Sequence, residues 1–238
     1  MMRHSRQVHI IGETGQKRLN ESTVAIIGLG GLGCSVMTHL ASAGVGKFII
    51  ADDKTIEESN LNRQFIYCSN DIGKRKPECA ATWIKRLNPA ASVTELDITV
   101  DETTAHKIGK CDIIMDCLDN YESRMALNRY SHDSNIRMVH GGVEAMIGQV
   151  TVIIPNVTPC LQCIFPKRRI DEIPSISPMV GTIGSIQAME AVKMLTIRHS
   201  PLVGRLLTID ESDNMYRITD IKKNDHCGCC SHKAVPDQ

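Results

Sequence analysis

Residues 23–33, TVAIIGLGGLG, constrain the fold more than any other stretch of the chain. A short apolar run ends in a turn that contains Gly28, Gly30, Gly31 and Gly33, in the spacing G-x-G-x-x-G with one glycine added. Glycines allow a tight turn after a buried strand, and bare backbone amides at the start of the next helix attract phosphate. The stretch predicts a strand–turn–helix unit that binds a nucleotide. A generic nicotinamide-type fold and a turn that binds nothing are the alternatives.

The rest of the chain alternates between expected strands and helices. Further strands are expected at 47–53, 92–98, 112–120, 137–140 and 149–154, and helices at 32–43, 77–89, 121–135 and 185–195. Residues 204–210 and 214–221 suit a final hairpin, residues 160–183 are expected to be irregular, and the tail beyond Cys230 to be frayed. This alternation indicates a doubly wound, mostly parallel, Rossmann-like α/β sheet.

Length and charge narrow the function classes. A chain of 238 residues suits one large domain, and its formal net charge of zero creates no field that would draw nucleic acid or a membrane surface. The start, MMRHSRQVHI, lacks the apolar run of a signal peptide, and no stretch reaches the roughly 18 apolar residues of a membrane span. We therefore expect a cytoplasmic protein that binds neither nucleic acid nor membrane.

Cations follow the glycine turn by a few tens of residues. Residues 59–64 read SNLNRQ, which places Arg63 among the hydrogen-bonding side chains of Asn60 and Gln64. Lys76 stands at the start of a helix, whose N-terminus also favours anions. Backbone amides largely satisfy a pyrophosphate, whereas a triphosphate that is being split needs cations around its β- and γ-phosphates. The cluster therefore indicates ATP, and ordinary surface charge is the alternative.

Two acidic residues are expected at the same edge of the sheet. Asp52 ends an expected strand, about where a ribose-binding acid should lie. Asp119 follows a second apolar strand that should neighbour the first, and a carboxylate there can hold Mg²⁺ against phosphates. Alternatively, Asp119 or Asn120 is the N-cap of the helix that follows.

Four of the ten cysteines form two Cys-x-x-Cys pairs. They are Cys160, Cys163, Cys227 and Cys230. Two such pairs fit a tetrahedral zinc site even across a long insert, and the metal would join the tail to the irregular middle segment. Cys229 and His226 are rival ligands in the second pair, and two unrelated thiol pairs are the alternative.

Together these residues resemble the ThiF/MoeB/HesA family of adenylyltransferases, which activate ubiquitin-like sulfur-carrier proteins. The resemblance rests on GLGGLG, Asp52, SNLNRQ, Lys76, DCLDN, GTIGSIQAMEAVKML and both cysteine pairs, and it begins at RHSRQ near residue 3. It implies a single adenylation domain over 1–238. An N-terminal arm at 3–22 and a nucleotide-binding core at 23–155 would precede, at 156–230, a crossover segment, a helix, a hairpin and the cysteine pairs.

The resemblance also implies a reaction. ATP would adenylate the C-terminal glycine carboxylate of a small β-grasp sulfur-carrier protein ending in Gly-Gly, and pyrophosphate would be released. The implied nucleotide-binding residues are Gly28, Gly30, Gly31, Gly33, Asp52, Ser59, Asn60, Arg63, Gln64, Lys76, Asp119 and Asn120. Arg63, Lys76 and Asp119 would be catalytic, with Asp119 carrying Mg²⁺. Arg6 would reach the γ-phosphate of the partner subunit's ATP, which implies a homodimer.

Two features depart from the family pattern. Lys54 stands where the family usually has a second acid, and the loop IFPKRRIDEIPSIS lacks a cysteine that many relatives carry. We therefore expect adenylation alone, with a separate protein as sulfur donor in cofactor biosynthesis (molybdopterin or thiamine) or tRNA thiolation. The alternatives are adenylation of a peptide or small-molecule carboxylate, a nicotinamide-dependent oxidoreductase, and a zinc-stapled scaffold without catalysis.

Overall fold

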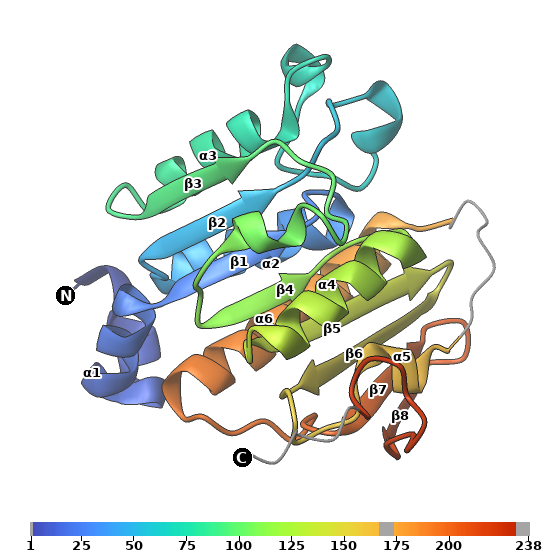
Figure 1. Ribbon diagram of the computed structural model, residues 1–238. Coiled ribbons are helices and arrows are strands. Elements are labelled where there is room, and N and C mark those ends of the chain that lie inside the picture. Colours follow the sequence, from blue (N-terminus) through green and yellow to red (C-terminus); the bar gives the residue numbers. More distant parts are fainter. Residues whose placement is uncertain (1, 167–173, 232–238) are drawn as a thin grey trace.

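The computed structural model describes residues 2–166 and 174–231, in which an eight-stranded sheet carries helices on both faces (Figure 1). The strands are β1 Thr23–Ile27, β2 Lys47–Ala51, β3 Ser92–Leu96, β4 Ile113–Asp116, β5 Arg137–Glu144, β6 Ile147–Ile153, β7 Arg205–Asp210 and β8 Met215–Asp220. Their order is β3-β2-β1-β4-β5-β6-β7-β8. Strands β3 to β5 pair in parallel, and β5 to β8 pair antiparallel. The predicted doubly wound, mostly parallel sheet is confirmed.

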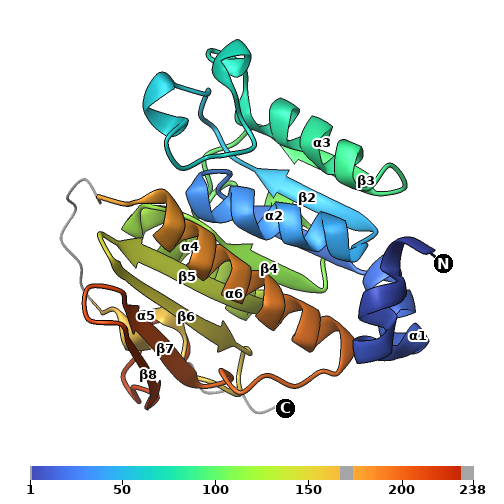
Figure 2. The same cartoon turned by 180° about the vertical axis from the view of Figure 1, so that it is seen from behind.

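The sheet has two apolar faces because successive side chains of a strand point to opposite sides. The helices are α1 Ser5–Glu21, α2 Gly31–Ala43, α3 Lys76–Leu87, α4 Tyr121–Asp133, α5 Leu161–Ile164 and α6 Ser177–Thr196, with 3-10 turns η1 Met2–His4, η2 Glu58–Asn60, η3 Ser69–Asp71 and η4 Ala105–Ile108. Val24 and Ile26 of β1 join the apolar cluster of α2, α3 and α6, which lie over one face in Figure 2. Ala25 and Ile27 join the cluster of η4 and α4 on the other face. Within the described ranges, no helix is both long and apolar enough to cross a bilayer.

The topology fixes where a ligand can bind. From β1 the chain moves outward through β2 to β3, and then it returns to β4 on the other side of β1. The carboxyl ends of β1 and β4 therefore flank a switch point of the sheet, the place where open α/β sheets bind ligands. The glycine turn follows β1 at this edge.

Two glycines of that turn are required by close packing. Gly28 has φ +91°, and a Cβ there would lie 2.6 Å from the carbonyl oxygen of Cys117. A Cβ on Gly33 would lie 2.1 Å from the carbonyl oxygen of Gly28. Glycine at these positions lets the first turn of α2 approach the ends of β1 and β4.

Several element boundaries differ from the prediction. Helix α6 begins at Ser177 instead of residue 185, because Pro178 is tolerated in a first helical turn, where no N–H is needed. Helix α5 interrupts the segment expected to be irregular, of which residues 167–173 lie outside the described chain. Strands β2 and β4 end before Asp52 and Asp119, which therefore stand in loops. The predicted fraying beyond Cys230 falls almost wholly on residues 232–238, which are also outside the described chain.

Candidate functional site

A cavity of about 710 Å³ opens at the carboxyl ends of β1, β2 and β4. The predicted nucleotide residues that line it are Gly28, Gly30, Gly31, Asp52, Ser59, Asn60, Arg63, Gln64, Lys76, Asp119 and Asn120. Among the described residues, Gly33 and Arg6 are not part of this lining. Gly33 is buried within α2, whereas Arg6 is exposed on α1, before the bend of that helix at Gly12.

Asp52 fastens the end of β2 to the glycine turn. One carboxylate oxygen accepts a hydrogen bond from the backbone amide of Leu29 at 2.7 Å, and the other accepts from the amide of Lys54 at 2.9 Å. Each oxygen keeps a second lone pair that can accept from a hydroxyl. Asp52 is therefore held in one orientation at the cavity wall, where its predicted ribose contact remains available.

The loop that contains residues 59–64 is fixed by its own polar side chains. Asn60 is buried, its Oδ1 accepts from the amide of Glu57 at 3.2 Å, and its Nδ2 donates to the hydroxyl of Ser59 at 3.3 Å. Arg63 donates to the carbonyl of Ser59 at 3.0 Å and to Oδ1 of Asn62 at 2.9 Å. Neither bond pairs the guanidinium with a carboxylate, and Arg63 is one of the residues that line the cavity.

Gln64 and Lys76 are buried polar groups at the cavity wall. Gln64 is 4 % exposed, and in the described chain its Oε1 has no hydrogen-bond partner. Lys76 is also 4 % exposed, and no carboxylate of the described residues pairs with its ammonium group. Lys76 lines the cavity, so its ammonium group favours an anion as the ligand there.

In the segment DCLDN after β4, Asp119 was expected either to hold Mg²⁺ or to cap the helix that follows, a role also open to Asn120. Asn120 is the N-cap of α4, since its Oδ1 accepts from the amide of Ser123 at 2.8 Å. The carboxylate of Asp119 does not cap this helix; it faces the cavity and lies 3.4 Å from Nζ of Lys54. One exposed carboxylate beside a phosphate site suits Mg²⁺, which takes few protein ligands and completes its shell with phosphate oxygens and water. Asp119 therefore fits a magnesium site.

Sequence reasoning missed the cavity wall beyond β3. Ile98, Thr99 and Val100 line it, and the hydroxyl of Thr99 donates to Asp53 at 2.5 Å. The rule that ligands bind beyond strand carboxyl ends applies to β3 as well and could have identified these residues. The apolar side chains among them, Ile98 and Val100, are expected to form the wall beyond the ribose.

A buried ionic network supports the floor of the cavity. Asp116 is fully buried, Nε of Arg124 donates to its carboxylate at 3.1 Å, and Nδ1 of His140 lies 2.7 Å from the same oxygen. Burial opposes ionisation of Asp116, but the charge of Arg124 and the bond to His140 lower its pKa overall. The network holds the end of β4, and hence Asp119, against α4 and β5.

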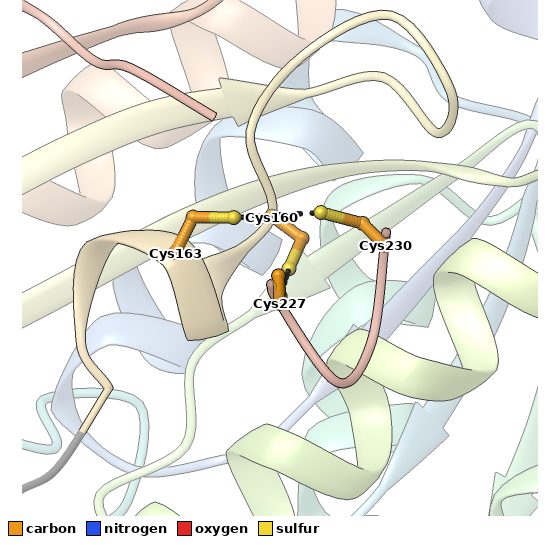
Figure 3. A group of neighbouring side chains, drawn as sticks. All are labelled: Cys160, Cys163, Cys227 and Cys230. Carbon is orange, nitrogen blue, oxygen red and sulfur yellow. Dashed lines mark hydrogen bonds between the residues drawn. The ribbon is translucent and has the colours of Figure 1, made fainter. Parts of the chain in front are cut away.

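The two cysteine pairs converge at one point away from the cavity (Figure 3). The sulfur atoms of Cys160, Cys163, Cys227 and Cys230 all lie within 4.8 Å of one another. Sγ of Cys160 is 3.6 Å from Sγ of Cys227, and Sγ of Cys163 is 3.4 Å from Sγ of Cys230. Tetrahedral zinc, with Zn–S bonds of about 2.3 Å, needs sulfurs about 3.8 Å apart. The cluster therefore fits the metal.

The rival ligands stand outside this cluster. Sγ of Cys229 accepts from Nδ2 of Asn128 at 3.2 Å, while Oδ1 of Asn128 accepts from the amide of Leu161, which follows Cys160. Asn128 thus connects the two cysteine segments. His226 is exposed. A hydrogen bond from Cys229 lowers the pKa of Cys160, whereas burial raises the pKa of Cys163 and of Cys230.

The chain matches the ThiF family model over residues 4–230. It is 35% identical to the SAMP-activating enzyme E1 of Haloferax volcanii, with 98% of this chain and 90% of that protein aligned. It is also 35% identical to the molybdopterin-synthase adenylyltransferase of Escherichia coli K12, over 97% of this chain and 96% of the relative. The sulfur carrier protein ThiS adenylyltransferase of the same organism is 32% identical, over 96% and 94%.

Solved structures show the same fold. The structure of Escherichia coli MccB with ATP superposes with a TM-score of 0.88 at 23% identity, and the match covers 96% of this chain and 73% of that one. The protein described as SeMet PaaA superposes with a TM-score of 0.80, over 94% and 74%. These likenesses extend across the sheet and its helices.

Proposed function

Because the chain belongs to the ThiF family, we propose that it is an ATP-dependent adenylyltransferase whose substrate is the C-terminal glycine carboxylate of a small ubiquitin-like sulfur carrier. The observation that carries the proposal is Lys76, a buried cation that shares one cavity with the glycine turn, Arg63 and Asp119. Relatives named as activators of SAMP, molybdopterin synthase and ThiS support the class of acceptor.

Each predicted residue has a role that follows from its position. The amides of the glycine turn contact the phosphates, and Asp52 accepts from the ribose hydroxyls. Arg63 and Lys76 balance the charge of the triphosphate. Asn60, through the remaining hydrogen of its side-chain amide, and Gln64 are neutral hydrogen-bond partners. Asp119 would hold Mg²⁺, which supplies further positive charge to the phosphate oxygens.

The chemistry needs alignment more than proton transfer. The acceptor carboxylate is already a nucleophile, and one of its oxygens forms a bond to the α-phosphorus while the bond from that phosphorus to the bridging oxygen breaks. Pyrophosphate leaves with the electron pair, and an acyl-adenylate remains. Rate enhancement then comes from positioning and from cations that stabilise charge on the leaving group.

Arg6 completes the site from a second subunit in this proposal. It is exposed on α1 and lies outside the cavity of its own chain, so it is free to reach the γ-phosphate in a homodimer. The cysteine cluster would hold one structural zinc ion. In this proposal a separate protein supplies sulfur, and the reaction takes place in the cytoplasm, where ATP is available and thiols stay reduced.

The test is ATP–pyrophosphate exchange with a carrier protein that ends in Gly-Gly. We expect exchange that requires ATP, Mg²⁺ and the intact carrier, and none with a carrier that lacks its last glycine. Exchange with a short peptide or a small carboxylic acid, and not with the carrier, would favour the alternative acceptors. A nicotinamide absorbance change without pyrophosphate turnover would contradict adenylation altogether.

A further inference from the structure

Lys54 reaches across the mouth of the cavity. It follows β2, whereas its partner Asp119 follows β4, and β1 with its glycine turn lies between these two strands (Figure 1). The ammonium group of Lys54 is 3.4 Å from Oδ2 of Asp119, and both residues line the cavity. The ion pair therefore spans the cavity in front of the turn where a nucleotide's phosphates would enter.

The backbone of Lys54 is fixed on both sides. Its amide donates to Asp52 at 2.9 Å, and its carbonyl accepts from the amide of Lys76 at 3.1 Å. Lys54 is thereby tied to both the expected ribose acid and the start of α3. The placement of its side chain over the cavity follows from this anchoring.

The ion pair contributes little to folding. The side chains of Lys54 and Asp119 are 58% and 72% exposed, and an ion pair that is open to water adds little to the stability of the folded state. Their electrostatic effect on each other is still clear. The two opposite charges lie 3.4 Å apart, close enough for each to cancel much of the other's field in the cavity. The ion pair is therefore expected to affect the binding of a charged ligand in the cavity more than the stability of the fold.

An unpaired Asp119 would repel a triphosphate until a metal ion joined it. Lys54 cancels that negative charge without a metal. We infer that Lys54 neutralises Asp119 before nucleotide binds, so that this chain takes up metal-free ATP and acquires Mg²⁺ afterwards. The inference rests on the proposed nucleotide site. It assigns Lys54 a positioning role that uncouples ATP binding from Mg²⁺ while catalysis still needs the metal.

Equilibrium binding of ATP, measured by calorimetry in EDTA and in excess Mg²⁺ without carrier, tests the inference. Wild-type protein should bind ATP under both conditions. Lys54→Met should raise the Kd of metal-free ATP roughly tenfold, because the uncompensated carboxylate of Asp119 would then repel the triphosphate, and the Kd of Mg²⁺–ATP less than about threefold. Lys74→Met is the matched control, because Lys74 is an exposed lysine 2.9 Å from Asp71 that is not among the described lining residues. It should change neither value.

A double-mutant cycle with Asp119→Asn identifies the cause. If Lys54 acts by neutralising Asp119, Lys54→Met should have less than about a threefold effect on metal-free ATP once Asp119 is uncharged. Three results would overturn the inference without affecting the nucleotide site. Lys54→Met could change the Kd of metal-free ATP equally with and without the Asp119 charge, it could change the Kd equally with and without Mg²⁺, or it could leave the Kd unchanged. Failure of wild-type protein to bind ATP even with Mg²⁺ would overturn the proposed function and this inference with it.

Discussion

The nucleotide cavity and the cysteine cluster are built in opposite ways. The cavity is open, and its charged groups extend from separate places in the chain: Arg63 from the loop after η2, Lys76 from the start of α3 and Asp119 from the loop after β4. The cysteine cluster is closed, and four sulfurs converge on a space that suits one ion. The cavity can therefore exchange its ligand without rearrangement of the fold, whereas a metal ion in the cysteine cluster would stabilise the fold itself.

The same contrast predicts how each region responds to mutation. In the cavity, Arg63 is half-buried and Asp119 is exposed, so removal of either side chain should spare stability. In the cluster, each sulfur has the other three as neighbours, so the loss of one leaves the others without a complete tetrahedral ligand set. The predictions below separate an effect on reaction rate from an effect on folding.

The largest effect is expected from Cys160→Ser. Structural zinc contributes about 10–16 kcal/mol of binding free energy at pH 7 in small zinc domains, and that energy is shared with folding. The variant should lose zinc and unfold at a clearly lower temperature, as measured by elemental analysis and thermal denaturation. Cys229→Ser should keep one zinc per chain, because Cys229 lies outside the group of four sulfurs. Metal-replete wild-type protein without zinc would refute the zinc site.

A rate effect without a folding effect is expected from Arg63→Ala and Asp119→Ala. Loss of one group that stabilises charge in a transition state typically costs about 10²-fold or more. ATP–pyrophosphate exchange should fall by that factor in both variants while circular dichroism and thermal unfolding stay near wild type. Arg86→Ala serves as the control, because Arg86 lies over the Trp83 ring and not in the described lining of the cavity. Near-normal exchange in both variants would place the site elsewhere.

A subunit-mixing experiment tests Arg6. Arg6→Ala and Arg63→Ala homodimers should each be nearly inactive in exchange. After mixing and re-equilibration, half of the dimers carry one subunit of each kind, and one of their two sites has both arginines intact. Activity should return to about a quarter of wild type, the share of intact sites in a symmetric dimer. No recovery, with exchange of subunits shown by mass spectrometry, would mean that Arg6 does not act across the interface.

The two regions also differ in how far the sequence predicted them. The cysteine cluster was predicted residue by residue, because two Cys-x-x-Cys pairs impose their geometry locally and only their meeting point depends on the fold. Of the candidate ligands in the second pair, Cys227 and Cys230 join the group of four sulfurs, and Cys229 bonds to Asn128. The mostly parallel sheet was also predictable from the sequence, because alternating strands and helices allow few topologies.

The cavity was predicted only in part, because it is assembled from distant loops. Motif spacing identified the cations and Asp119, yet the wall at Ile98–Val100 has no motif and becomes evident only when β3 lies beside β2. Lys54 was visible in the sequence as a departure, but its contact with Asp119 depends on the end of β4 passing beside β1. Contacts between the ends of different strands depend on the topology of the sheet, so a local sequence pattern cannot predict them.

The last prediction expects no effect: the thiols outside the cysteine cluster should form no covalent adduct with the carrier protein. Burial raises the pKa of Cys34, beside the glycine turn, to about 12, and burial likewise raises that of Cys117 well above its usual range. Below its pKa a thiol is protonated, so at pH 8 only about one Cys34 in ten thousand would be a thiolate. We therefore expect the enzyme to stop at the acyl-adenylate. After incubation with carrier and ATP–Mg²⁺, intact mass and a non-reducing gel should show unmodified protein. A reductant-sensitive enzyme–carrier adduct would contradict this expectation, and Cys68, which is exposed and outside the cluster, would then be the first residue to replace by serine.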